Sequence, residues 1–171
     1  MAKQRPARGK GAFDASNLKQ PMSVLPQRSP LCFSREQFVS EAMHAMQKEH
    51  RGCVLVTDDG GMESPLEGIF TERDVLYRII DRGRNPATLP LQEVMTRSPD
   101  ALLSNATVAF VLNRMAVGGF RHVPVVDEND HPVAIISVRD VVEFLVDYFP
   151  REIMNLPPQV GANITTSREG A

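Results

Sequence analysis

Gly68-Ile-Phe-Thr-Glu-Arg-Asp74 decides the fold of this chain, because a close copy returns 66 residues later as Ala134-Ile-Ile-Ser-Val-Arg-Asp140. Each copy reads small residue, two apolar residues, hydroxyl, two further residues and aspartate, and apolar residues at helical spacing follow it. Each copy is therefore expected to be a buried strand that passes directly into a helix, with a hydroxyl and a carboxylate in the first helical turn. We name these places the Thr71–Asp74 corner and the Ser137–Asp140 corner.

The order of elements around the two corners also repeats. Each half reads as strand, helix, strand, strand, helix, from short apolar runs between turn signals and from apolar residues at helical spacing. Ser34-x-x-Gln37 matches a capping box and predicts that a helix begins near residue 35. The first half is expected to contain a helix over 35–48, strands over 52–57 and 65–70, and a helix from Thr71 to near 83. The second half is expected to contain a strand over 99–103, a helix capped by Ser104 and stopped by Gly118-Gly119, strands over 121–126 and 132–136, and a helix from Val138.

Each half has only about 60 residues and would bury little core alone. Packing the two halves through their sheets solves that problem. We therefore predict an α/β (α+β) fold of two tandem β-α-β-β-α motifs, related by a pseudo-twofold axis and packed through their small sheets. The expected divisions are 1–20, a basic flexible tail; 21–84, the first motif; 85–90, a linker; 91–149, the second motif; and 150–171, a C-terminal extension with one short helical turn.

Composition and charge are those of an ordinary globular protein, with 42% hydrophobic and 23% charged residues and a formal net charge of -2. Four Lys and Arg residues lie among the first ten, but such a short tail is most often solvated and does not by itself indicate a nucleic-acid partner. No apolar run reaches the ~20 residues that span a membrane, and no apolar segment of a secretory signal follows the basic tail. Cys32 and Cys53 lack C-x-x-C spacing, so two reduced core thiols and a cytoplasmic location are expected.

The repeated pattern resembles the CBS-domain pair, also called a Bateman module. The resemblance rests on the two corners, on Gly119-Phe-Arg-His-Val-Pro-Val-Val-Asp127 and on Glu93-Val-Met-Thr96, and it covers roughly residues 21–149. It implies a stand-alone regulatory module that binds adenosine-containing ligands, namely AMP, ADP, ATP or sometimes S-adenosylmethionine, between its halves. It also implies a homodimer formed through helices and a protein effector that reads ligand occupancy. No cofactor is expected to be required.

The resemblance implies that Asp74 and Asp140 each hold the vicinal hydroxyls of a ribose, assisted by Thr71 and Ser137. An ionised carboxylate has two acceptor oxygens and can take two adjacent hydroxyl donors in charge-assisted hydrogen bonds. A place in the first helical turn favours the ionised carboxylate. The same Thr/Ser-x-x-Asp spacing also satisfies a capping box that needs no ligand, and the two roles can coexist.

Phosphate contacts are implied for Arg121 and His122, and for Arg51 in the first half. An arginine binds phosphate through two parallel hydrogen bonds, and a protonated histidine adds a third. With Arg51 aligned to Arg121 at an offset of 70, Gly52 falls where the second half has His122, so the two sites are expected to be unequal. We predict that the better phosphate site combines Asp74 with Arg121 and His122. The alternative is that Arg121 is a surface charge and His122 an ordinary strand residue.

Four residues of the expected strands are candidates for the walls of a slot that holds a flat base: Val54, Ile69, Pro124 and Ile135. Pro124 cannot donate to a strand ladder, so it is expected at a sheet edge or opposite a cleft. The alternative for all four residues is a place in the hydrophobic core.

The sequence contains no recognisable catalytic or metal-binding pattern. Its four histidines and two cysteines have no metal-ligand spacing, and neither a phosphate loop nor a dinucleotide-binding fingerprint is present. Two functions remain in competition. One is a non-enzymatic sensor that binds an adenine nucleotide and signals by conformational change. The other is a ligand-free interaction protein that keeps the fold and dimerises. Neither involves a membrane or nucleic acid.

Overall fold

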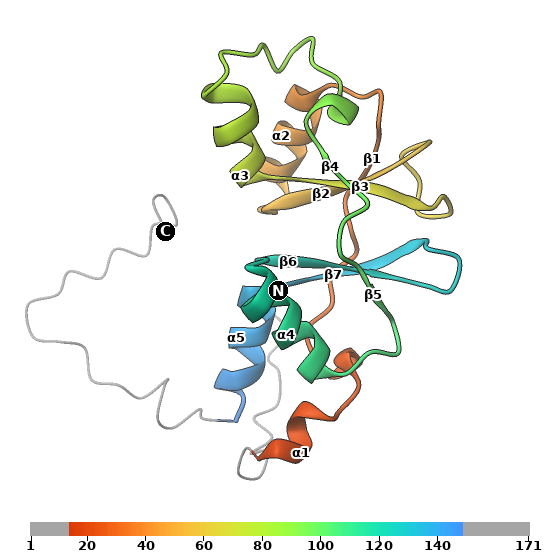
Figure 1. Cartoon of the computed structure of the whole chain (residues 1–171), viewed down its shortest axis with the longest axis vertical. Helices are drawn as coiled ribbons and strands as arrows, with labels where there is room; N and C mark the ends of the chain where they lie inside the picture. Colours follow the sequence, from red (N-terminus) through yellow and green to blue (C-terminus); the bar gives the residue numbers. More distant parts are fainter. Residues whose placement is uncertain (1–13, 149–171) are drawn as a thin grey trace, which may run out of the picture.

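The two predicted halves form two stacked layers in the computed structural model, which describes residues 14–148 (Figure 1). A four-stranded sheet of order β1-β2-β3-β4 belongs to the first half, and a three-stranded sheet of order β5-β6-β7 belongs to the second. The sheets face each other in the middle of the molecule, and the helices cover their outer sides (Figure 1). This arrangement confirms the predicted α/β pair packed through its sheets.

The element order of the first half matches the prediction closely. Its elements are β1 (Cys32–Ser34), α2 (Val39–Lys48), β2 (Cys53–Thr57), β3 (Leu66–Thr71), α3 (Glu72–Asp74) and the π-helix η2 (Val75–Ile80). The short 3-10 helix η3 (Leu91–Glu93) and β4 (Thr96–Arg97) lie in the segment that leads into the second half, and β4 pairs with β3 of the first half. The second half comprises β5 (Leu102–Leu103), α4 (Val108–Gly118), β6 (His122–Val126), β7 (Pro132–Ser137) and α5 (Val138–Val146). The α1 helix (Ala15–Leu18) and the 3-10 helix η1 (Met22–Val24) precede both halves.

Helices α2 and α4 begin about four residues later than predicted. Ser34 ends β1, and its backbone N–H donates to the Gln37 side chain at 2.9 Å, so this pair stabilises a turn rather than a helix start. Ser104 follows β5 directly and its N–H donates to Val126 O of β6 at 3.1 Å, and Thr107 is the residue that precedes α4. In both halves the chain needs one turn to pass from strand to helix.

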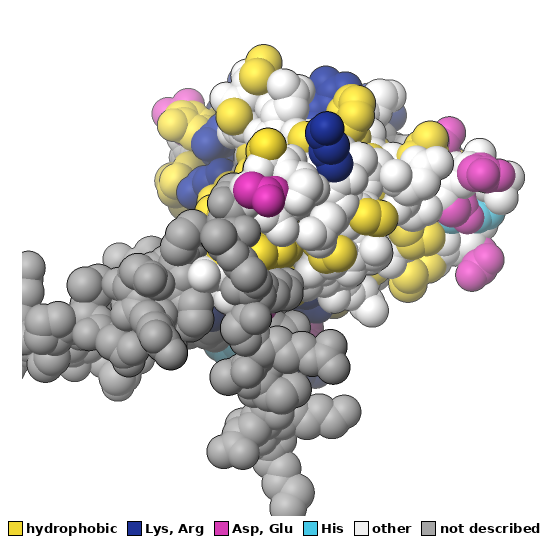
Figure 2. Space-filling view, turned by 90° about the horizontal axis from the view of Figure 1, so that it is seen from below, with side chains coloured by type: hydrophobic (Ala, Val, Ile, Leu, Met, Phe, Trp, Pro, Cys, Tyr) yellow, Lys and Arg dark blue, Asp and Glu magenta, His cyan; other side chains and the backbone are white. Residues whose placement is uncertain are grey.

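Three apolar clusters hold the described residues together. One core lies inside each half, and a third cluster lies between the sheets; it consists of Cys53, Leu55, Ile69 and Ile135. Hydrophobic side chains also remain on the surface, as Figure 2 shows for the face seen from below. Those exposed on α4 and α5 include Phe110, Val117 and Val142. Within residues 14–148, no helix has both the length and the apolar character needed to cross a membrane.

The segment that leads into each half packs against the other half. Met22 is completely buried in the core of the second half, and Leu91 is completely buried in the core of the first. The backbone contacts correspond as well: Met22 N donates to Ala106 O and Leu91 N donates to Gln37 O, both at 2.9 Å. We call this arrangement the exchange of the lead-in segments.

Residues 14–20 were predicted to belong to a flexible tail, but they contain α1 and contact the second half. Asp14 Oδ1 caps α1 by accepting from Ser16 N at 2.6 Å, and Asn17 Nδ2 donates to Tyr148 Oη at 3.0 Å. Leu18 packs against the second core. The rest of the predicted tail, the C-terminal extension and its helical turn lie outside the described residues.

The strand registers correct the alignment of the repeat. Cys53 pairs with Thr71 in the first half, and His122 pairs with Ser137 in the second. Since Thr71 and Ser137 are equivalent corner residues, Cys53 is the counterpart of His122. The two halves therefore match at an offset of 69 up to this strand and of 66 from the corner onward, so the hairpins differ in length by three residues rather than four.

The same register shows that aligning Arg51 with Arg121 was wrong by one residue. Glu72 N donates to Gly52 O, and Val138 N donates to Arg121 O in the equivalent place. Gly52 is therefore the counterpart of Arg121.

Candidate ligand-binding site

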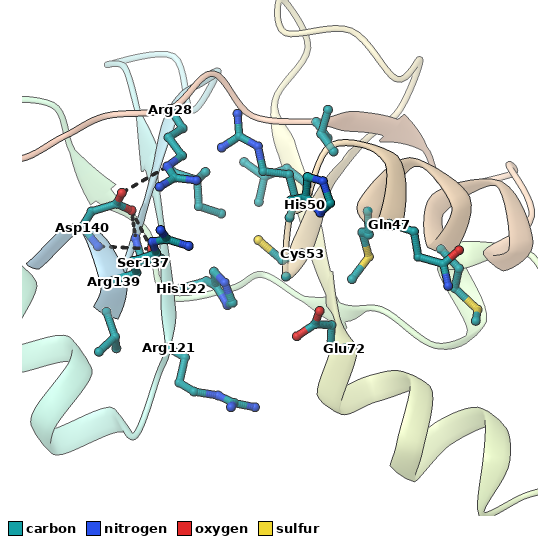
Figure 3. Close-up of a pocket in the computed structure, with 18 of the residues that line it drawn as sticks. Arg28, Gln47, His50, Cys53, Glu72, Arg121, His122, Ser137, Arg139 and Asp140 are labelled. Atoms are coloured by element: carbon teal, nitrogen blue, oxygen red, sulfur yellow. Dashed lines mark hydrogen bonds and ion pairs between the residues drawn. The ribbon is translucent and has the colours of Figure 1, made fainter. Parts of the chain in front are cut away.

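A cavity of about 800 Å³ lies between the two halves (Figure 3). Its volume is within the range of small-molecule sites. The end of α2, the start of β2 and Glu72 border it on one side, and the start of β6 and the Ser137–Asp140 corner border it on the other. Cationic side chains outnumber carboxylates around it, which favours an anionic ligand. The charged lining residues are Arg28, Arg51, Arg121, Arg139, Glu72 and Asp140.

The Ser137–Asp140 corner is the predicted reciprocal cap at the start of α5. Asp140 Oδ2 accepts from Ser137 N at 2.7 Å and from Ser137 Oγ at 2.6 Å, and Asp140 N approaches Ser137 Oγ at 3.4 Å. The second carboxylate oxygen, Oδ1, accepts from Arg28 Nε at 3.1 Å. Asp140 is completely buried. Both of its oxygens therefore have partners within the protein.

Arg28 is a site residue that sequence reasoning missed. It lies in the first lead-in segment, where its backbone oxygen accepts from Ile135 N at 3.0 Å and so attaches the segment to β7. Its side chain is about one-third exposed, and Nη2 lies 3.9 Å from Glu143 Oε1. No local motif marks Arg28, because only the exchange of the lead-in segments brings it to the second half.

The Thr71–Asp74 corner forms the same cap but has a different second partner. Asp74 Oδ2 accepts from Thr71 N and from Thr71 Oγ1, both at 2.8 Å, whereas Oδ1 accepts from Arg78 Nε at 3.1 Å. Arg78 also donates to Val94 O and, at 2.9 Å, to Thr96 Oγ1. Neither Thr71 nor Asp74 is among the residues that line the cavity.

Arg51, Arg121 and His122 all line the cavity, as expected for residues that would face a phosphate. The predicted combination of Asp74 with Arg121 and His122 is not the one found, because these two residues share the cavity with Asp140. The reason is the antiparallel hairpin: His122, at the start of β6, pairs with Ser137, at the end of β7. The start of β6 therefore lies beside the corner of its own half.

His122 rests on Gly52, across the boundary between the halves. A Cβ atom at Gly52 would lie 2.7 Å from His122 Cε1 and 2.8 Å from Nε2, so the imidazole occupies the place of a side chain at position 52. Glu72 Oε2 is 3.5 Å from the same point. Burial, and then the Arg121 guanidinium, lower the pKa of His122 below its usual 6.5, and Asp140 acts in the opposite direction. Its protein surroundings therefore favour a neutral His122.

Only Ile135, of the four candidate base-slot residues, lines the cavity. Val54 lies in the core of the first half, and Ile69 lies in the cluster between the sheets. Pro124 is buried in β6, opposite Ile135. Most of the apolar wall comes instead from residues that the sequence reasoning did not single out: Leu31, Met43, Met46, Leu55, Val75 and Leu76.

Pro124 has the one-sided pairing expected of a proline within a strand. Its strand, β6, lies between β5 and β7, but β5 pairs only with Val125 and Val126. The missing N–H therefore falls where β6 has a neighbour on a single side, which agrees with the predicted edge position.

The two cysteines are free, as the sequence indicated. Burial raises the pKa of Cys53, which lines the cavity, to about 12 and that of Cys32 to about 11, so both thiols stay protonated near neutral pH. Between residues 14 and 148, no three His, Cys, Asp or Glu side chains are grouped closely enough to hold a metal ion.

Comparisons with known proteins agree with this two-part organisation. The family model for the CBS domain matches residues 22–81 and again residues 91–147. The meiotically up-regulated gene 70 protein of Schizosaccharomyces pombe is 32% identical over 124 residues, which are 72% of this chain and 16% of that protein. The CBS domain-containing protein CBSCBSPB1 of Arabidopsis thaliana is 31% identical over 132 residues, 77% of this chain and 23% of that protein. The chain thus spans less than a quarter of the length of these relatives.

Solved structures of similar size share the fold. An uncharacterized conserved protein from Pyrococcus horikoshii superposes with a TM-score of 0.66 and 27% identity, over 74% of this chain and 92% of that one. A CBS domain protein from Pyrobaculum aerophilum, solved in complex with AMP, superposes with a TM-score of 0.63 and 22% identity, over 76% of this chain and 98% of that one.

Proposed function

This chain belongs to the CBS-domain family, with two CBS motifs in tandem, and we propose on that premise that it is a regulatory module without enzymatic activity that binds an adenine nucleotide. The ligand would occupy the cavity between the motifs. One observation carries this proposal: the cavity brings the Ser137–Asp140 corner together with Arg51, Arg121 and His122. The AMP complex of the Pyrobaculum protein supports an adenine nucleotide as the ligand class.

The proposed contacts follow from the donors and acceptors around the cavity. Asp140 Oδ1 would accept from ribose hydroxyls, because Oδ2 already accepts two hydrogen bonds in the cap. Arg51 and Arg121 would bind phosphate oxygens, and His122 would join them when protonated. The surplus of arginines favours AMP, ADP or ATP over S-adenosylmethionine, whose sulfonium is a cation.

We assign the ligand to the Ser137–Asp140 corner and a structural role to the Thr71–Asp74 corner. Arg78 donates three hydrogen bonds, one of them to Asp74, and the other two connect η2 to Val94 and to Thr96 at the start of β4. A ligand at Asp74 would have to break this network. At Asp140 it would have to displace the Arg28 side chain, which is partly exposed to the cavity.

Signalling would follow from the position of the cavity between the motifs. A ligand that contacts both halves binds best to one relative arrangement of them and shifts the population toward it. A homodimer formed through helices is part of the proposal. Leu76 in η2 and Val142 in α5 are exposed, whereas Ile79 and Val141 on the same helices are buried in the cores, so only part of each predicted apolar face is available to a second copy. The cytoplasmic location remains a prediction from the sequence.

One observation favours the alternative of a ligand-free interaction protein. Both oxygens of each aspartate already have partners, from a cap and an arginine, without any ligand. In that case substituting either aspartate would cost about the stability of a helix cap, ~1 kcal/mol, and no small molecule would stabilise the protein.

A thermal-melt panel of the wild-type chain with AMP, ADP, ATP, S-adenosylmethionine and GTP separates the two functions. A ligand at about 100 times its Kd adds ~2.7 kcal/mol, which for this chain length is a Tm increase of roughly 5–10 °C. The proposal predicts an increase for at least one adenine nucleotide. GTP is the control for the base, and S-adenosylmethionine is the control for the phosphate. A panel without any shift would favour the interaction protein.

A further inference from the structure

We propose that Arg28 makes the cavity selective for phosphorylated nucleosides by exchanging partners. It pairs with Asp140 when the cavity is empty and with the phosphate of the ligand when ribose hydroxyls take its place at Asp140. This inference rests on the proposed function and deepens it, because it names the residue that makes the cavity distinguish nucleotides from neutral nucleosides.

Both carboxylate oxygens of Asp140 already accept hydrogen bonds from protein groups. Oδ2 accepts two hydrogen bonds from Ser137, at 2.7 and 2.6 Å, and these hold the start of α5. Oδ1 accepts from Arg28 Nε. Because Asp140 is completely buried, a ligand hydroxyl reaches Oδ1 only if the Arg28 side chain moves. Binding at this corner therefore changes the surroundings of Arg28.

The Arg28 side chain has few contacts, whereas its backbone is fixed. The hydrogen bond from Ile135 N holds the backbone oxygen of Arg28 at 3.0 Å. The one other ion-pair partner of its guanidinium among the described residues is Glu143, at 3.9 Å, a distance beyond a good hydrogen bond. Arg78, which holds Asp74, is tied at two further points. Turning the Arg28 side chain about its own Cα therefore breaks one hydrogen bond, whereas turning that of Arg78 breaks three.

Once displaced from Asp140, the Arg28 guanidinium needs a new partner. A neutral nucleoside that takes Oδ1 breaks the ion pair and offers Arg28 no replacement. A phosphate offers a planar set of acceptors that suits the two-pronged donor geometry of arginine. Arg51, Arg121 and Arg139 also line the cavity, so an anion placed there lies among several cations. The exchange thus favours the phosphorylated ligand and opposes the neutral one.

Isothermal titration of the full chain with adenosine, AMP and ATP tests this exchange in wild type, Arg28→Gln, Arg28→Lys and Arg97→Gln. Arg97 is the control, because it is an exposed arginine of the second lead-in segment that donates to Gln92 O. It lies next to Thr96, which pairs with Ile69 as Arg28 pairs with Ile135. In Arg28→Gln we expect AMP and ATP to bind about 10-fold more weakly, the loss of one charge-assisted contact, whereas adenosine binds at least as tightly as to wild type. Arg97→Gln should match wild type.

The outcomes are distinguishable. Equal weakening of AMP and adenosine in Arg28→Gln, or no change in either, would overturn the exchange and leave Arg28 a purely structural residue. No binding of any of the three ligands to wild type would overturn the proposed function, and the inference with it. If Arg28→Gln fails to fold, Arg28→Lys decides, since lysine keeps the charge but lacks the planar fork. For it we expect a preference for AMP over adenosine reduced by about 3-fold, and an unchanged preference would overturn the proposal.

Discussion

The Thr71–Asp74 and Ser137–Asp140 corners have the same sequence pattern and the same reciprocal cap, yet a different arginine holds each aspartate. Arg78 reaches Asp74 from one turn further along the same helix, whereas Arg28 reaches Asp140 from a segment more than one hundred residues away in the chain. At the offset of 66, the counterpart of Arg78 is Phe144, a core residue of the second half. The residue four positions after the aspartate therefore distinguishes the two corners. An arginine there pairs with Asp74 from the same helix, whereas a phenylalanine there leaves Asp140 facing the cavity.

The largest expected effect is on stability and concerns Phe144, the counterpart of Arg78 in the second half. Phe144→Ala should lower the free energy of unfolding by about 3–5 kcal/mol, because it leaves a cavity among buried residues, and it should do so far more than Arg78→Ala, whose side chain is about one-third exposed. Urea-induced unfolding measures both. Phe110→Ala is the control for side-chain type, because Phe110 is exposed on α4. Equal losses for Phe144→Ala and Arg78→Ala would mean that the two positions are equivalent after all.

The next effect distinguishes the corners by their ligand response. Asp140→Asn should abolish the stabilisation of ~2.7 kcal/mol given by a nucleotide at about 100 times its Kd, and Asp74→Asn should retain it, because Asp74 does not line the cavity. Thermal melts with and without ligand measure this, and each variant's own melt without ligand corrects for a weakened cap. Loss of the response in Asp74→Asn alone would reverse our assignment of the two corners.

A smaller effect on stability concerns Gly52, the counterpart of Arg121. Gly52→Ala should cost about 1–3 kcal/mol, because the new Cβ would lie within 2.8 Å of two His122 ring atoms. In a His122→Ala background the same substitution should cost much less, since the ring is gone. Chemical denaturation of the two single variants and the double variant gives the coupling energy. Additive costs would show that the ring does not fill this space.

The smallest effect is a pH dependence that belongs to the second half. Because the pKa of His122 is lowered in the folded protein, the unfolded chain binds more protons between that pKa and about 6.5. Stability should therefore be fully present above pH 6.5 and fall as the pH decreases through this window. Asp14, Asp59 and Asp127, whose pKa values are also lowered, act only below about pH 4.

Unfolding measured between pH 5.5 and 7.5 should accordingly show a shallower slope in His122→Gln than in wild type. A phosphate in the cavity would raise the pKa of His122, so nucleotide binding should also strengthen as the pH falls. Identical slopes in wild type and His122→Gln would exclude His122 as the titrating group.

The sequence predicts what depends on local patterns. Both corners, their caps, the order of elements and the pairing of two halves follow from periodicity and from Thr/Ser-x-x-Asp spacing. The register of the repeat does not follow, because Arg51 and Arg121 are the same residue type in similar places, and only the pairing of β2 with β3 and of β6 with β7 shows that they are not equivalent. Arg28 was missed for a related reason: its partner is set by the exchange of the lead-in segments, which no window of sequence contains.

The exchange of the lead-in segments also bears on how the protein is made. The core of the first half draws on residues up to Met95, so it is complete soon after its last strand has been synthesised. The core of the second half needs Met22 and Leu25 from the beginning of the chain and Phe144 from near its end. At roughly 5–20 residues per second, translation would keep Met22 and Leu25 waiting for about 6–24 s. During that interval two core side chains of the second half have no core to enter, which makes the early lead-in segment a natural place for a chaperone to bind the nascent chain.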